Sequence, residues 1–167
     1  MPKLLVLFDP RSPDMAALAD AIAEGARLVR FAEVDVRCVS HTMPDGISAT
    51  RHRTLESADA LATYDGVVIG AFSAETKGDG VVDSLSAATT SLVDKVGSVF
   101  TTARADAERS AVLWSVLAAM ADRGMILVPP RVNGLPSDEL SSAREQGKRV
   151  ADVVGWVTHA RSHHHHH

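Results

Sequence analysis

Short apolar runs alternate along the chain with segments in which apolar residues recur at helical spacing. An apolar run bounded by turn residues is typical of a buried strand, whereas recurrence every three to four residues is typical of an amphipathic helix. The pattern predicts strands at residues 4–8, 33–39, 66–72, 96–100 and 125–128. It predicts helices at about residues 13–30, 55–62, 81–92 and 106–123, and a last helix that Ser137 caps and that runs to Val157.

Strands of this kind that alternate with helices predict one α/β domain over residues 1–160. Apart from residues 33–39, which alternate between apolar and charged positions, the strands read as continuous apolar runs. Such runs are the pattern of a parallel sheet covered by helices on both of its faces. The sequence therefore predicts a doubly wound, three-layer α/β/α architecture. Residues 161–167, which end in five histidines, are interpreted as an expression scar and a His tag.

Composition excludes several classes of function. The 167 residues carry a net charge of −4, with basic and acidic residues mixed along the chain, so no basic stripe for nucleic acid is expected. The single cysteine, Cys38, excludes an internal disulfide or a thiolate metal site, and its alternation with charged residues predicts that it points into the core. No membrane-length apolar run and no signal peptide are found, so a cytoplasmic protein is expected.

The turn after the first predicted strand stands where nucleotide-binding α/β folds hold a phosphate. Such a turn presents backbone N–H groups and a helix N-terminus to the anion. Here Pro10 and Pro13 remove two of those donors, and Asp9 and Asp14 add negative charge. The position thus has the layout of a phosphate loop without its usual chemistry.

Eight segments resemble a known family in sequence and in order. They are KLLVL (3–7), AIAEGA (21–26), TMP (42–44), YDGVVIG (64–70), SVF (98–100), GMILVP (124–129), PSDEL (136–140) and AREQG (143–147). With them the chain resembles the flavodoxin-like NAD(P)H:quinone oxidoreductases of the tryptophan-repressor-binding-protein (WrbA) type. The resemblance implies a five-stranded parallel sheet of flavodoxin type with strand order 2-1-3-4-5.

The resemblance also implies an FMN site at the carboxyl ends of the strands. The positions in this chain that match the site are Pro10, Arg11, Ser12, Pro13 and Asp14 after the first strand, Phe72, Ser73, Glu75 and Thr76 after the third, and Thr101, Thr102 and Arg104 after the fourth. The family's aromatic residue is replaced by Glu75, its glycine-rich third loop contains no glycine, and its long insertion after the fifth strand is reduced to residues 130–135.

These replacements predict that FMN binding is absent or weak. The leading hypothesis is a binding or regulatory module, or a protein that uses another small ligand at the same edge of the sheet. A small anion is favoured there because Arg11, Lys77 and Arg104 are nearby. The alternative is a working FMN-dependent NAD(P)H:quinone oxidoreductase with a reduced site. No catalytic residue can be assigned under either hypothesis.

Three further features have competing interpretations. The carboxylates expected at the same edge, Asp9, Asp14, Glu75, Asp79, Asp106 and Glu108, could hold a divalent cation, but a solvated rim is favoured because no ligand spacing is recognisable. His41 and His52 are interpreted as surface-loop residues, since no orienting partner is visible. Trp114 lies on an apolar helix face that suits either the core or a subunit contact, and a homodimer or higher homo-oligomer is expected.

Overall fold

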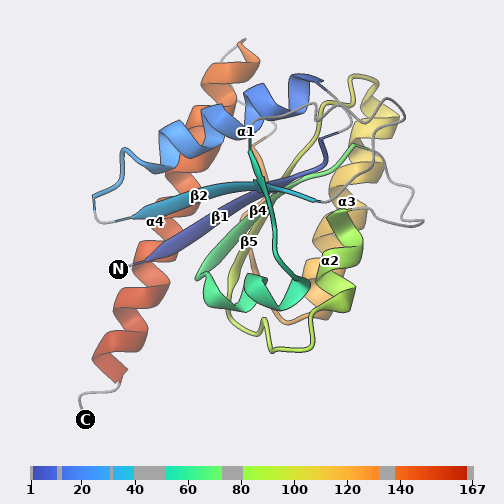
Figure 1. Ribbon diagram of the computed structural model, residues 1–167. Helices are drawn as coiled ribbons and strands as arrows, with labels where there is room; N and C mark the ends of the chain where they lie inside the picture. The colour runs from blue at the N-terminus through green and yellow to red at the C-terminus, as the bar shows by residue number, and fades with distance from the viewer. Residues whose placement is uncertain are drawn as a thin grey trace.

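The computed structural model describes residues 2–10, 13–30, 32–39, 52–72, 81–131 and 138–164. The strands are β1 (Lys3–Phe8), β2 (Glu33–Cys38), β3 (Arg53–Thr54), β4 (Gly66–Gly70), β5 (Val96–Phe100) and β6 (Ile126–Leu127). The helices are α1 (Pro13–Ala26), α2 (Val81–Ala87), α3 (Asp106–Asp122) and α4 (Glu139–His164), together with the 3-10 helix η1 (Ala58–Thr63). Strands and helices alternate as the sequence predicts (Figure 1).

The sheet is parallel and confirms the predicted order of strands. Its order is β3-β2-β1-β4-β5-β6, so the five predicted strands occupy the 2-1-3-4-5 arrangement. The structure contains one strand that was not predicted: β3, a two-residue strand that pairs with Arg37 and Cys38 at the edge beyond β2. The sequence did not predict it because Arg53-Thr54 is a short polar pair, not an apolar run. The helix predicted at 55–62 is the 3-10 helix η1.

Two predicted helices end earlier than their apolar pattern does. α1 ends at Ala26 instead of Arg30, because only the Arg27 amide still bonds four residues back, to the Ala23 carbonyl. The Leu28 and Val29 amides bond three residues back, to the Gly25 and Ala26 carbonyls. α2 ends at Ala87 instead of residue 92, because the Asp59 carboxylate accepts hydrogen bonds from the amides of Thr89 and Thr90. Long-range and end-of-helix hydrogen bonds thus override the local periodicity.

The last helix is longer than predicted. α4 continues past Val157 to His164, since no glycine or proline interrupts the sequence there. Its predicted cap, Ser137, lies outside the described residues. Asp138 instead accepts the Leu140 amide with Oδ1 at 3.1 Å, as an N-terminal capping residue does.

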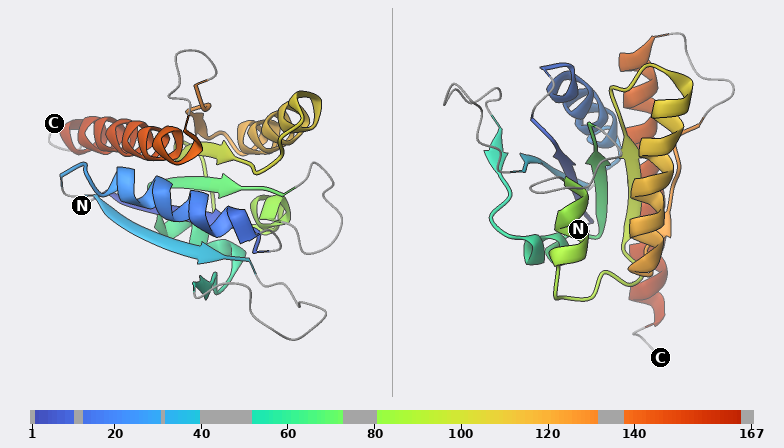
Figure 2. Two further views of the ribbon diagram at one scale, coloured as in Figure 1. Left: turned by 90° about the horizontal axis from the view of Figure 1, so that it is seen from above. Right: turned by 90° about the vertical axis from the view of Figure 1, so that its right-hand side faces the viewer.

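The sheet separates two helical layers, and each layer buries one face of the strands. α1 and α4 cover one face and α2 and α3 the other (Figure 1). Alternate β1 side chains divide accordingly: Leu4, Val6 and Phe8 pack under α1 and α4, whereas Leu5 and Leu7 pack on the other face. Two views at right angles show α3 and α4 flanking the sheet edge that β6 forms (Figure 2). No helix among the described residues is long and apolar enough to cross a membrane.

α1 and α4 approach each other so closely that their backbones touch at two glycines. A Cβ atom at Gly25 of α1 would overlap the carbonyl oxygen of Arg144, and one at Gly147 of α4 would overlap the carbonyl oxygen of Ile22. The two positions are reciprocal, one on each helix. Glycine is therefore required at both by the distance between the helices, not by the conformation of the chain.

The single tyrosine of the chain is buried and bonded to a carboxylate. Tyr64 is 9% exposed, and its hydroxyl donates a hydrogen bond to Asp35 Oδ2 at 2.7 Å. Burial, followed by the hydrogen bond to Asp35 and the negative charge of Asp35, raises the pKa of Tyr64 to about 12. The neutral phenol is thus the form that the fold stabilises.

We expect Gly25→Ala and Gly147→Ala each to lower the free energy of unfolding by about 1–3 kcal/mol, because the added methyl forces the helices apart. Gly155→Ala is the matched control, since a Cβ there meets nothing within 4 Å. The control should raise stability by up to about 1 kcal/mol through helix propensity. Urea denaturation of the three variants measures these changes, and equal effects at all three glycines would contradict the close approach.

Stability should fall at alkaline pH through Tyr64. The unfolded phenol ionises near about pH 10, whereas the folded phenol ionises at about 12. The contribution of Tyr64 is therefore complete below the unfolded pKa and is lost as the pH rises through the folded value. Phenolate absorbance follows this one group, and Asp35→Asn should lower its pKa while leaving it above that of free tyrosine. An unchanged pKa in Asp35→Asn would show that Asp35 contributes nothing.

Candidate functional site

The strands β1, β4 and β5 end side by side at the carboxyl edge of the sheet. The Asp9 amide donates to the Gly70 carbonyl at 3.1 Å, and the Ala71 amide donates to the Phe100 carbonyl at 3.1 Å. The segments that follow these three strands therefore begin at the same height along the strand direction. This brings the described members of the three predicted groups of site residues to one edge, as the register of the sheet requires.

The first group lies at the start of α1. Asp9 and Pro10 are buried, Pro13 is the first residue of the helix, and Asp14 lies in the first turn with an exposed carboxylate. A carboxylate at this place stabilises the N-terminus of the helix through the helix dipole. Arg11 and Ser12 lie outside the described residues.

The second and third groups follow β4 and β5. Phe72 is 43% exposed, whereas Ser73, Glu75 and Thr76 lie outside the described residues. Thr101 is buried and accepts the Ala103 amide with its hydroxyl oxygen at 3.1 Å, which makes a tight turn after β5. Thr102 is half-buried and Arg104 is exposed.

One ion pair connects the first group with the third. Arg104 Nη2 lies 4.0 Å from Asp14 Oδ2, and the two side chains are 78% and 71% exposed. An exposed pair at this distance adds little stability and opens easily. It nevertheless places a carboxylate and its own counter-ion beside the helix N-terminus at the carboxyl edge.

The remaining sequence-based interpretations concern metal binding, Cys38 and Trp114. Among the described residues, no group of three His, Cys, Asp or Glu side chains could hold a metal ion, and Glu75 and Asp79 lie outside those residues. Cys38 is buried as predicted, and burial raises the pKa of its thiol. Trp114 is 71% exposed, which excludes the core interpretation.

The interpretation of His52 as a surface-loop residue is wrong. Its Nε2 lies 2.8 Å from Asp20 Oδ1, its side chain is only 15% exposed, and its ring meets the edge of Phe8 at 5.6 Å between centroids. Asp20 is on α1, far from His52 in sequence, so no local pattern pointed to the pair. His41 lies outside the described residues.

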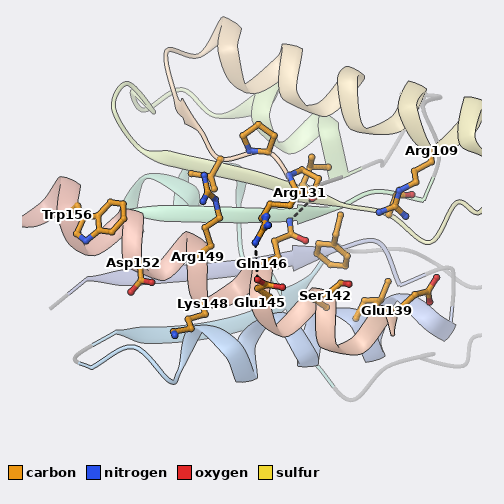
Figure 3. A pocket seen from close by; sticks show the side chains of 18 residues that line it. Arg109, Arg131, Glu139, Ser142, Glu145, Gln146, Lys148, Arg149, Asp152 and Trp156 are labelled. Atoms are coloured by element: carbon orange, nitrogen blue, oxygen red, sulfur yellow. Dashed lines mark hydrogen bonds and ion pairs between the residues drawn. The ribbon is translucent and has the colours of Figure 1, made fainter. Parts of the chain in front are cut away.

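A cavity of about 470 Å³ opens beside the carboxyl ends of β5 and β6. Its walls come from α4, from residues 128–131 after β6, from residues 99–101 at the end of β5, and from Leu18 and Arg109. Figure 3 shows Trp156 at one end of this cavity and Arg109 toward the other. No local sequence pattern indicated this cavity, because it depends on how β5 and the segment after β6 separate.

The separation has a specific cause in the hydrogen-bond ladder. The Ile126 amide donates to the Lys95 carbonyl and the Val128 amide to the Gly97 carbonyl, both at 2.8 Å. The next donor in this series would be residue 130, opposite the Val99 carbonyl, but Pro130 has no N–H.

Gln146 of α4 supplies the missing donor. Its Nε2 donates to the Val99 carbonyl at 2.7 Å and to Ser98 Oγ at 3.0 Å. The Ser98 hydroxyl in turn donates to the Val128 carbonyl at 2.6 Å. The side chain of Gln146 therefore takes the place of a continuing β6, and the cavity lies where that strand would have run.

Two curated proteins resemble the chain over most of its length. A NAD(P)H dehydrogenase (quinone) from Azorhizobium caulinodans is 31% identical over 152 residues, which cover 81% of this chain and 72% of that protein. A NAD(P)H dehydrogenase (quinone) from Gluconacetobacter diazotrophicus is 29% identical over 149 residues, with the same shares of 81% and 72%. No protein-family model matches the chain.

Solved structures agree on the fold. The diflavin flavoprotein A3 of Nostoc sp. has a TM-score of 0.64 at 19% identity, covering 98% of this chain and 97% of that one. Flavodoxin 2 of Bacillus cereus has a TM-score of 0.56 at 16% identity, covering 92% and 97%. The architecture is therefore flavodoxin-like.

We expect Gln146→Leu to lower the free energy of unfolding by about 1–3 kcal/mol, because the Val99 carbonyl loses its donor. In a Pro130→Ala background, residue 130 regains an N–H in register with that carbonyl, so the same substitution should cost less. Urea denaturation of the two single variants and the double variant measures the coupling. Equal costs in the two backgrounds would show that Pro130 does not leave the carbonyl unpaired.

Proposed function

Because the chain belongs to the NAD(P)H dehydrogenase (quinone) family and has a flavodoxin-like fold, we propose that it is a family member that works without FMN at the usual place. It is then a binding or regulatory module for a small anionic ligand. The family is of the FMN oxidoreductase type, so the proposal concerns the residues by which this chain departs from it.

The observation that supports the proposal is the acidic, donor-poor start of α1. An FMN phosphate at this edge would meet the Asp14 carboxylate in the first turn of the helix, with Arg104 4.0 Å from it. Pro10 and Pro13 cannot donate backbone hydrogen bonds. Phosphate binding at helix N-termini depends on such donors and on the absence of competing negative charge.

The expected loss of affinity is large. A hydrogen bond to a charged group contributes roughly 1.5–3 kcal/mol. Two missing donors therefore correspond to a rise of about two to four orders of magnitude in the FMN dissociation constant. Repulsion by Asp14 acts in the same direction.

The second candidate function is FMN-dependent reduction of quinones by NAD(P)H. The curated relatives, named NAD(P)H dehydrogenase (quinone), favour it. Bound FMN would supply two-electron hydride transfer. Arg104 would then have to leave Asp14 and face the phosphate, which the small energy of an exposed ion pair permits.

An FMN titration distinguishes the two functions. We expect purified protein to lack the visible absorbance of flavin, and added FMN to keep its fluorescence at micromolar protein. Asp14→Asn should strengthen any residual FMN binding several-fold, because it removes a negative charge from the helix N-terminus. Asp122→Asn is the matched control. Asp122 is the last residue of α3, at the C-terminal end of that helix, so its substitution should leave FMN binding unchanged. A stoichiometric complex of the unaltered protein with sub-micromolar affinity would establish the second function and overturn the first.

A further inference from the structure

The cavity between α4 and the segment after β6 has an apolar wall of planar and branched side chains. The wall consists of Phe100, Val128, Pro129, Pro130, Leu18 and Ala143. Its volume of about 470 Å³ lies within the range of small-molecule sites. Because the separation of β5 from the segment after β6 is held by Gln146, the cavity is preformed and does not need a ligand to open it.

Basic side chains outnumber acidic ones by one around this wall. Arg109, Arg131, Lys148 and Arg149 line the cavity together with Glu139, Glu145 and Asp152. Arg131 is paired with Glu145 at 3.1 Å. In the described part of the chain, Arg109, Lys148 and Arg149 take part in no ion pair. The ionic side chains that line the cavity therefore leave a net charge of one positive unit, which matches a monoanion.

An aromatic ring stands at one end of the cavity. Trp156 is 69% exposed and lies on the same stripe of α4 as Glu145, Arg149 and Asp152, at successive spacings of four, three and four residues. Figure 3 shows the Arg149 side chain rising from α4 toward the segment after β6, between Trp156 and Arg131. An indole, two proline rings and a guanidinium group are surfaces on which a flat ring stacks.

We propose that this cavity binds a planar aromatic carboxylate, with the ring between Trp156 and the Pro129-Pro130 wall and the carboxylate on Arg149. A guanidinium group matches the two oxygens of a carboxylate in geometry and charge. The proposal names the ligand class for the anion-binding module described above and rests on that function. It can fail separately, because FMN would bind at Asp14 and Arg104 and not at Trp156.

The two tryptophans of the chain make an internal control for the test. Their indole N–H groups give two signals in a nitrogen–proton correlation spectrum, and Trp114→Phe assigns them. Trp114 is 71% exposed on α3 and does not line the cavity, so it is as accessible as Trp156 but outside the site. The probe is 2-naphthoate, compared with its neutral amide, with acetate and with inorganic phosphate.

We expect 2-naphthoate to shift the Trp156 signal saturably and to leave the Trp114 signal in place. The dissociation constant should be on the order of 100 µM, as a ligand of this size permits. The neutral amide, acetate and phosphate should each bind at least about tenfold more weakly, because each lacks the charge or the ring. Arg149→Gln should weaken 2-naphthoate binding about tenfold, whereas Arg53→Gln, on the opposite sheet edge, should not.

Four results would overturn the proposal. Equal binding of the amide would remove the role of the carboxylate, and equal binding of acetate or phosphate would remove the role of the ring. An unchanged affinity in Arg149→Gln would exclude the assigned cation. A Trp156 signal that shifts with protein concentration alone would show that a second copy of the chain covers the cavity. Tight FMN binding together with the expected naphthoate result would refute the flavin-independent function and leave the cavity assignment standing.

Discussion

The backbone contact between α1 and α4 fixes the position from which the rest of the site is built. Gly25 and Gly147 allow the helices to touch, and Gly147 directly follows Gln146 in the chain. The seating of α4 therefore determines whether the Gln146 side chain reaches the Val99 carbonyl at 2.7 Å. Through that bond the helix packing sets the width of the gap between β5 and the segment after β6. A contact in one layer of the fold thus controls a cavity at the edge of another.

The alternation of apolar runs and helical segments predicted a parallel sheet between two helical layers, whereas the strand order was implied by the resemblance to the family. The predicted end of the last strand, Val128, is one residue beyond the end of β6, since Pro129-Pro130 cannot extend a ladder. Features that depend on distant partners could not be predicted in this way. The end of α2 is set by Asp59, and the half-buried His52 places its Nε2 2.8 Å from Asp20 Oδ1. Asp59 and Asp20 are both distant in sequence from the residues that they contact, so a local pattern could not indicate them.

The cavity was missed for a related reason, although a signal for it existed. Gln146 is a polar residue close in sequence to the buried positions Ala143, Gly147 and Val150 of α4, and Pro130 falls where the ladder next needs a donor. Either fact alone is unremarkable in a sequence. Together they become informative once the register of β5 and β6 is known. Only the register shows that the carbonyl without a backbone donor is that of Val99. Candidate residues at the carboxyl edge, in contrast, could be placed from the fold class alone.

The short β6 also affects whether the sheet can pair with a strand of another molecule. It forms the outer edge of the sheet, and an outer edge with free amide donors can recruit a strand from another molecule and begin an aggregate. β6 is only two residues long, and the two prolines that follow it have no N–H to offer to an incoming strand. The two prolines that line the cavity beside β5 therefore also protect this edge of the sheet against pairing with another molecule.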